Sequence, residues 1–311
     1  MADDPAVLGF LTAINANAGP PAEEVGVEQA RQGWAAYLSL AGSGPELPSV
    51  TDIAIPGPAG DIPARAYRPT ADADGLPVVA FFHGGGWVLG SVDSHDSLCR
   101  QLALASGCLV VSVEYRRPPE APFPAAADDA LAAVEWLAAH ADEIGGDGTR
   151  LAVAGDSAGG NLSAVTTLRA REAGGPSIAF QLLIYPAVDA AMSYPSMREN
   201  GEGKLLTAAT MTWFWDIYLG PDADRSDPRV SPIAASDLAG LPPALVITAE
   251  LDPLRDEGEA YAMRLEQAGV PVKVSRYDGQ IHAFFGMGSL FPAGATVVDE
   301  AGIALREALN P

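Results

Sequence analysis

The segment from Arg150 to Asn161 constrains the fold of this chain more than any other. An apolar strand-like run, residues 151–154, passes directly into Gly155-Asp-Ser-Ala-Gly159 and then into helix-forming sequence. Glycines two positions before and after Ser157 allow a very tight turn, because a Cβ at either position would collide with the neighbouring strand or helix. Such a strand-turn-helix holds a serine hydroxyl exposed and predicts a nucleophile elbow. The chain has 33 glycines, so this pattern needs chemical partners before it carries weight.

A base for Ser157 has to be a histidine whose pKa lies near the working pH. The chain has four: His83, His95, His140 and His282. In sheets with such an elbow the order along the chain is serine, then Asp or Glu, then histidine, and only His282 follows Ser157. His282 comes just after the strand-like run 271–277, so it is expected in a loop at a strand's carboxyl end. We therefore predict His282 as the base and not as an ordinary loop histidine.

The acid that orients this base has to lie on a loop that meets His282 in space. Asp252 follows the β-branched run 243–249 and is the first candidate. Asp252 also fits a helix cap, because Pro253 after it suits the first position of a helix. Three other carboxylates lie near enough to compete: Glu250, Asp256 and Asp278. Position alone favours Asp252 and leaves the others open.

A buried strand, residues 77–82, opens into His83 and three consecutive glycines, Gly84 to Gly86. Glycines let backbone N–H groups converge on a developing oxyanion, and His-Gly-Gly-Gly is the oxyanion loop of esterases and lipases. We predict that the N–H groups of Gly84, Gly85 and Ala158 form an oxyanion hole, with His83 shaping the loop. A phosphate-binding loop is the alternative, but neither of the nucleotide-binding glycine patterns is present.

Strand-like and helical stretches alternate along the chain after the first three strands. The strands are expected at residues 50–55, 64–68, 78–82, 109–115, 151–154, 179–185, 244–249 and 272–277. The helices are expected at residues 94–105, 124–141, 158–173, 256–268 and about 294–309. Such alternation predicts an α/β fold with a mostly parallel eight-stranded sheet covered by helices on both faces. The predicted site residues all fall at carboxyl ends of strands, where active sites lie in such sheets.

Two segments fall outside this alternation: the amphipathic start, residues 1–45, and an aromatic stretch, residues 187–240. We expect them to form a helical cap over a hydrolase-like core made of residues 46–186 and 241–311.

The run from Met211 to Leu219 holds more aromatic side chains than one helix face can bury on the core. Trp213 and Trp215 are therefore predicted to line a substrate pocket, whereas Phe214 and Ile217 fit a helix buried all round equally well.

The formal net charge of −22 argues against nucleic-acid partners and anionic membranes, both of which require positive potential. The first residues carry no basic region or apolar run, and no stretch approaches the length of a membrane span. Cys99 and Cys108 are expected as separate buried thiols without metal-ligand spacing. These features predict an acidic cytoplasmic protein that lacks stable membrane association and binds no metal.

Five segments together resemble the hormone-sensitive-lipase-like group of α/β-hydrolases, which are bacterial carboxylesterases with HGGG and GDSAGG motifs. They are His83 to Trp87, Tyr115 to Glu120, Gly155 to Gly160, Asp252 to Gly258, and His282, in matching order and spacing. The resemblance covers nearly the whole chain and maps the family's aspartate onto Asp252 and its cap onto the two irregular segments.

The resemblance implies hydrolysis of short- to medium-chain acyl esters through an acyl-enzyme, with no cofactor. It also favours a homodimer through the last strand and the terminal helix. The substrate-binding residues predicted here are Trp87, Tyr185, Trp213, Trp215, Ala283 and Phe285. An amidase or lactonase with the same triad is the nearer alternative, and a non-catalytic binding protein on the same fold is the more distant one.

The sequence departs from the family pattern in two places. Arg117 and Pro118 stand in a turn where the family has Leu-Ala, which leaves the chemistry untouched. Ala283 follows the base where the family usually has glycine, and its methyl group puts the size of the substrate in doubt.

Overall fold

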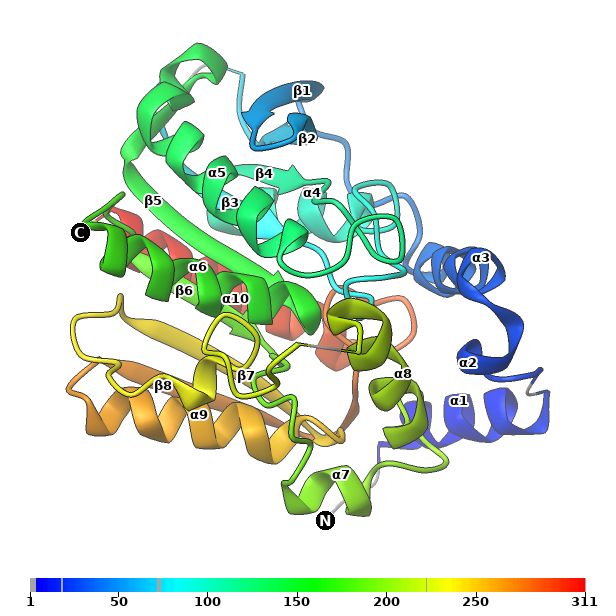
Figure 1. Cartoon of the computed structure of the whole chain (residues 1–311). Coiled ribbons are helices and arrows are strands. Elements are labelled where there is room, and N and C mark those ends of the chain that lie inside the picture. The colour runs from blue at the N-terminus through cyan, green and yellow to red at the C-terminus, as the bar shows by residue number, and fades with distance from the viewer. Residues whose placement is uncertain (1–3, 18, 72–73, 222, 311) are drawn as a thin grey trace.

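The computed structural model of the protein describes residues 4–17, 19–71, 74–221 and 223–310 (Figure 1). A single eight-stranded sheet, in the order β1-β2-β4-β3-β5-β6-β7-β8, forms its centre. The strands are β1 (Ser49–Gly57), β2 (Gly60–Arg68), β3 (Leu76–Phe82), β4 (Leu109–Val113), β5 (Gly146–Asp156), β6 (Phe180–Ile184), β7 (Ala244–Leu251) and β8 (Val272–Ile281). β2 pairs antiparallel with β1 and β4, and every pair of neighbours from β4 to β8 is parallel. The predicted fold and all eight predicted strands are confirmed.

The central strands are mostly apolar, as strands must be when both of their faces are covered. All seven residues of β3 and all five of β4 and of β6 are buried, which is the pattern of parallel strands between two helical layers. β5 begins five residues earlier than predicted, at Gly146, where Gly146 and Asp147 pair with the start of β3 ahead of a register shift. That stretch is polar, so only the buried half of the strand left a pattern in the sequence.

Helices cover the two faces of the sheet, as predicted. α4 (Asp96–Ser106) and α10 (Pro292–Leu309) pack against each other on one face. The other face carries α5 (Ala125–His140), α6 (Ala158–Ala173) and α9 (Arg255–Gln267), which lie in front of the sheet in Figure 1. Cys99 on α4 and Cys108 before β4 are buried free thiols. No helix in the described part of the chain is long and apolar enough to cross a membrane.

The two irregular segments of the sequence form short helices that gather at one end of the sheet (Figure 1). The first segment holds α1 (Pro5–Ala16), α2 (Ala22–Val25), α3 (Val27–Leu38) and the 3₁₀ turn Ser39–Ala41. The second holds α7 (Pro195–Glu199), α8 (Ala208–Leu219) and the 3₁₀ turn Pro232–Ala234, and a further 3₁₀ turn, Ala141–Ile144, follows α5. α2 contacts α8, so the two segments meet although they lie almost 200 residues apart.

Candidate active site

Ser157 occupies the turn between β5 and α6 in a conformation that few non-glycine residues adopt. Its φ is 57° and its ψ is −115°, and its N–H donates to the carbonyl of Ile184 at 2.8 Å. A Cβ on Gly155 would run into the carbonyl of Gly159, and one on Gly159 would run into the carbonyl of Phe82. The two glycines therefore let the strand and the helix approach closely enough to force the turn. The nucleophile elbow predicted from the sequence has its steric basis in these contacts.

His282 joins Ser157 to Asp252 through its two ring nitrogens. Nε2 lies 3.0 Å from the Oγ of Ser157, and Nδ1 lies 2.7 Å from Oδ2 of Asp252. The carboxylate is fully buried and its other oxygen accepts from the N–H of Leu254 at 2.8 Å. Asp252 thus caps the turn after β7 and also contacts the imidazole, so both interpretations of this residue hold. The arrangement is that of a serine–histidine–aspartate triad, with each residue at the carboxyl end of a different strand.

The three competing carboxylates are engaged elsewhere or exposed. Oε2 of Glu250 accepts from the N–H of Gly279 at 2.7 Å, which ties together the ends of β7 and β8. Asp256 accepts from the N–H of Ser196 at 2.8 Å and from the guanidinium of its neighbour at position 255. Asp278 is exposed at the surface. Asp252 is therefore the carboxylate that hydrogen-bonds to the histidine.

The glycine loop after β3 offers a different set of N–H groups from the one predicted. The N–H of Gly84 is occupied, because it donates to Oδ1 of Asp156 at 2.8 Å. Gly85 and Gly86, with φ values of 102° and 58°, face the cavity beside Ser157. Their N–H groups, and that of Ala158 at the start of α6, find no acceptor among the described residues. Of the three predicted donors, Gly84 therefore has its N–H directed at Asp156, whereas Gly85 and Ala158 keep theirs available, as does Gly86, which the prediction did not include.

His83 holds this loop through contacts of its ring and of its carbonyl group. Its ring stacks on Tyr115 with centroids 4.2 Å apart, and the Tyr115 hydroxyl donates to the carbonyl of His83 at 2.7 Å. Complete burial holds the pKa of His83 well below its usual range, so the ring is neutral. Its Nδ1 lies 3.0 Å from the carbonyl oxygen of Gly84, which a neutral ring satisfies as a donor.

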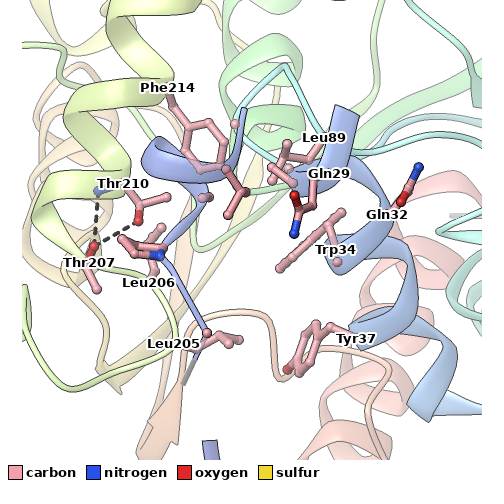
Figure 2. A pocket seen from close by; sticks show the side chains of 18 of the residues that line it. Gln29, Gln32, Trp34, Tyr37, Leu89, Leu205, Leu206, Thr207, Thr210 and Phe214 are labelled. Atoms are coloured by element: carbon pink, nitrogen blue, oxygen red, sulfur yellow. Dashed lines mark hydrogen bonds between the residues drawn. The ribbon is translucent and has the colours of Figure 1, made fainter. Parts of the chain in front are cut away.

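A cavity of about 690 Å³ opens above Ser157 and His282 (Figure 2). Its floor consists of Ser157, His282 and the glycine loop, and its walls come from α2 and α3 on one side and residues 205–214 on the other. Among the described residues, the lining contains no Asp, Glu, Lys or Arg, and the larger side chains are mainly apolar or aromatic. Prominent among them are Trp34, Tyr37, Leu89, Leu205, Leu206 and Phe214, with Gln29, Gln32, Thr207 and Thr210 as the polar members. The cavity suits an uncharged, largely apolar ligand.

Of the three tryptophans predicted for the pocket, two lie in the protein interior and the third is partly exposed. Trp87 and Trp215 are fully buried with ring centroids 4.3 Å apart, and Trp87 stacks on Tyr218 at 4.4 Å. Trp213 is half-buried and its ring lies 5.2 Å from that of Phe214. α8 turns Trp215 toward the core and Phe214 toward the cavity, because successive side chains of a helix point about 100° apart. Phe214 is therefore the aromatic residue of α8 that lines the cavity.

Of the three remaining predicted pocket residues, two adjoin His282 and one lies in the core. The ring of Tyr185 lies 4.6 Å from the imidazole, and Phe285 is buried in the core under α10. Ala283 is buried with a φ of 62°, and its carbonyl accepts from the hydroxyl of Tyr37 on α3 at 3.3 Å. None of the six predicted substrate-binding residues is part of the described cavity lining.

α3 contributes the aromatic wall that the sequence analysis did not identify. Ala30, Gly33, Trp34 and Tyr37 all line the cavity and lie three, one and three residues apart, which places them on one helix face. That spacing is visible in the sequence, but it identifies an apolar face without revealing what the face covers. No cluster of three or more His, Cys, Asp or Glu suited to a metal ion occurs within the described ranges.

Comparison with protein families matches residues 79–286 to a family described as alpha/beta hydrolase fold. The match includes the glycine loop, the elbow and all three residues of the triad.

Named relatives and solved structures point to one activity. The carboxylesterase NlhH of Mycobacterium tuberculosis (strain ATCC 25618 / H37Rv) is 45% identical over 254 residues, covering 80% of this chain and 79% of that protein. The ethyl acetate hydrolase of Pseudomonas putida is 40% identical over 321 residues, covering 100% of this chain and 99% of that protein. An ester hydrolase from the metagenome of Lake Arreo, complexed with a derivative of bipyridine phosphonate, superimposes with a TM-score of 0.95 at 40% identity. That similarity covers 98% of this chain and 99% of the other.

Proposed function

The chain belongs to the hormone-sensitive-lipase-like family of α/β-hydrolases and is a carboxylesterase, and on that premise we propose that Ser157, His282 and Asp252 carry out the ester hydrolysis. The observation that carries this assignment is the hydrogen-bonded chain from Ser157 Oγ through both ring nitrogens of His282 to Asp252, at 3.0 and 2.7 Å. Ser157 and His282 both line the cavity, where an ester carbonyl can approach the hydroxyl.

In the first half of the reaction the Oγ of Ser157 attacks the ester carbonyl while Nε2 of His282 accepts its proton. Asp252 holds the proton on Nδ1 and stabilises the imidazolium that forms. The ring then gives its proton to the departing alcohol as the carbon–oxygen bond breaks, and an acyl-enzyme remains. In the second half, water takes the place of the alcohol and the same groups release the acid.

The oxyanion of each tetrahedral intermediate is held by the N–H groups of Gly85, Gly86 and Ala158. Two arguments support this set: these groups have no acceptor in the described part of the chain, and both glycines line the cavity beside Ser157. Donors that already point at the site need no reorganisation as charge develops. Each lowers the free-energy barrier by on the order of 3 kcal/mol.

The test of the assignment is Ser157→Ala, assayed with a short-chain aryl ester. We expect a loss of about 10³-fold or more in kcat. The matched control is Ser163→Ala, a buried serine two turns along α6 whose hydroxyl donates to the carbonyl of Gly159. Near-full activity in the Ser157 variant would overturn the assignment.

For the substrate we propose uncharged esters with short to medium acyl chains. The apolar cavity without charged lining residues supports this choice, because a carboxylate on the substrate would lose its hydration there without gaining a partner. A series of aryl esters with acyl chains from two to about sixteen carbons tests the proposal. A maximum of kcat/KM among the longest chains would contradict it.

The same triad can also cleave amides and lactones, and this alternative is separated by assay. Parallel measurements with an anilide and a lactone of matched size should give kcat/KM values far below that of the ester, because the named relatives are esterases. The binding-protein alternative has little support, since all three residues of the triad are intact.

We further propose that residues 1–45 and 187–240 act as a cap on a core of residues 46–186 and 241–311, since α2, α3 and α8 wall the cavity. We also propose a cytoplasmic location and a homodimer. β8 is an edge strand of the sheet, and its partly exposed residues, with α10 behind them, leave room for a second subunit. Light scattering coupled to size exclusion tests the dimer, and a monomer at micromolar concentration would exclude it.

A further inference from the structure

A second histidine–carboxylate pair lies directly beneath the glycine loop. Asp156, the residue before Ser157, is buried, and its Oδ1 lies 3.3 Å from Nε2 of His95. Its Oδ2 lies 3.4 Å from the same nitrogen. The triad does not use either residue. His95 stands just before α4, so the pair connects the elbow to a helix on the far side of the loop.

The carboxylate of Asp156 holds the first glycine of the loop. The N–H of Gly84 donates to its Oδ1 at 2.8 Å, and a Cβ on Gly84 would collide with the carboxylate. The carbonyl of the same residue lies 3.0 Å from Nδ1 of His83. Both backbone polar groups of Gly84 are therefore held by hydrogen bonds.

The hydrogen bonds of Gly84 fix the direction of the N–H group of Gly85. The carbonyl of Gly84 and the N–H of Gly85 belong to one peptide plane, and in a trans peptide they point in opposite directions. An orientation imposed on Gly84 is therefore transmitted to the N–H of Gly85, which faces the cavity.

His95 keeps the carboxylate in place. Within the described residues, Asp156 Oδ2 has His95 as its only hydrogen-bond partner. A buried carboxylate that loses one of its two partners carries a large desolvation cost and rotates toward another donor. The ring itself is held by Ser94, whose hydroxyl lies 2.9 Å from Nδ1. In the tautomer with the proton on Nε2, the ring accepts from this hydroxyl at Nδ1 and donates to Asp156 at Nε2. His95 is thus held through Nδ1, and its Nε2 faces the carboxylate of Asp156.

We propose that His95 is a positioning residue for ester hydrolysis, acting through Asp156 and Gly84 to aim the N–H of Gly85 at the oxyanion. The inference rests on the proposed role of this loop as the oxyanion hole. Because the oxyanion exists only in the transition state, loss of His95 lowers kcat and leaves substrate binding nearly unchanged.

The experiment compares His95→Leu, which removes the donor, with His95→Gln, whose amide nitrogen reaches the place of Nε2. We expect kcat to fall about 10- to 100-fold in His95→Leu with KM within about threefold, and His95→Gln to retain activity within about fivefold. The inhibition constant of an aryl boronic acid, which forms a tetrahedral adduct with the serine, should rise in His95→Leu by the same factor as kcat/KM falls.

Cys99→Ala is the matched control, since Cys99 is a buried side chain one turn further along α4. It should lower the unfolding temperature while kcat and the boronic acid constant stay near the wild-type values. Equal losses in His95→Leu and His95→Gln, or a loss confined to KM, would overturn the proposal.

If His95→Leu does not fold, His95→Asn replaces it, because its amide is too short to reach Asp156. It should then be about tenfold less active than His95→Gln, and equal activities would overturn the proposal. A wild-type protein without esterase activity would instead refute the proposed function, so the two failures are distinguishable.

Discussion

Nδ1 of His282 lies 2.7 Å from Oδ2 of Asp252, and the two side chains are 6% and 0% exposed. With water excluded, the carboxylate depends on the imidazole and on the N–H of Leu254 for its hydrogen bonds. The contact therefore fixes which ring nitrogen carries the proton, and it leaves Nε2 free to act as a base toward Ser157.

Asp252→Asn should lower kcat by about 10²- to 10⁴-fold, because an amide that donates to Nδ1 stabilises the wrong tautomer of His282. KM should change far less. Steady-state kinetics with an aryl ester measure both constants. Asp256→Asn is the control, since that carboxylate contacts Ser196 and Arg255 and not the histidine. A loss of similar size in the control would show that the effect comes from the loop and not from the triad.

Gly86→Ala should reduce kcat/KM by at least about 10²-fold. The new methyl group would collide with the ring of Phe214, and the φ of 58° is strained for alanine. An oxyanion donor and a cavity wall are displaced together. Gly240→Ala isolates the backbone effect, because its φ is 74° and no atom lies within 4 Å of the added Cβ. The control should keep its activity. Comparable losses in both variants would show that the collision with Phe214 is not the cause.

Arg31→Met should raise KM several-fold with a smaller effect on kcat. Arg31 docks α3 on the core through two contacts with Glu120, at 2.7 and 2.8 Å, and through the carbonyls of Val88 at 2.8 Å and Pro118 at 3.0 Å. Loss of these contacts loosens the helix that carries Trp34. KM for a medium-chain ester is the measurement, with Arg229→Met, which breaks a pair within one exposed turn, as the control. An unchanged KM would indicate that α3 is held by its apolar face alone.

The ion pair between Arg31 and Glu120 depends on pH. Arg31 lowers the pKa of Glu120 from 4.5 to about 2, mainly by hydrogen bonding. A depressed folded pKa means that the stabilisation is complete above pH 4.5 and is lost as the pH falls toward 2. Docking of α3 should therefore be unaffected between pH 5 and 8.

Glu257→Gln should flatten the dependence of stability on pH. Burial raises the pKa of Glu257 well above its usual range, while one oxygen accepts from the N–H groups of Val188 and Asp189. A raised carboxyl pKa makes the folded state bind a proton that the unfolded state releases above pH 4.5. The free energy of unfolding of the wild-type protein should then fall as the pH rises from the ordinary carboxyl pKa toward the raised pKa of Glu257, by up to about 1.4 kcal/mol per pH unit.

The amide cannot ionise and keeps an oxygen for both donors, so the variant should match the wild type near pH 5 and exceed it near pH 9. Urea unfolding at the two pH values measures this difference. Glu143→Gln, at an exposed position, should leave the pH dependence of the wild type intact. Parallel curves for Glu257→Gln and the wild type would show that Glu257 does not titrate with folding.

The positions of the strands along the chain, the elbow and the candidate base could be predicted because each leaves a local pattern. Apolar runs located the strands, glycine spacing located Ser157, and chain order left one histidine. The acid could not be decided locally, since four carboxylates lie within a few residues of the relevant strand ends. Its identity depends on which of them meets the imidazole, and that is a property of β7 and β8 together.

Local sequence patterns could not identify the residues of the cavity wall or the proposed oxyanion donors, for a different reason. Whether Trp215 or Phe214 faces the cavity depends on how α8 is rotated on the core, and hydrophobicity is similar on all of its sides. Which glycine N–H is free depends on the carboxylate of Asp156, 72 residues away. Such assignments need the packing of segments that are distant in the sequence.

The closure of the sheet end by α1 also bears on how the protein is made. Asp4 accepts a hydrogen bond from Gln280, 276 residues later, and Val7 and Leu11 of α1 pack in the cluster that contains Phe291. During synthesis α1 leaves the ribosome long before these partners exist, so its apolar face stays uncovered while the intervening residues are translated. Productive maturation of the nascent chain therefore depends on keeping that face from other partners until residues 280–291 have emerged.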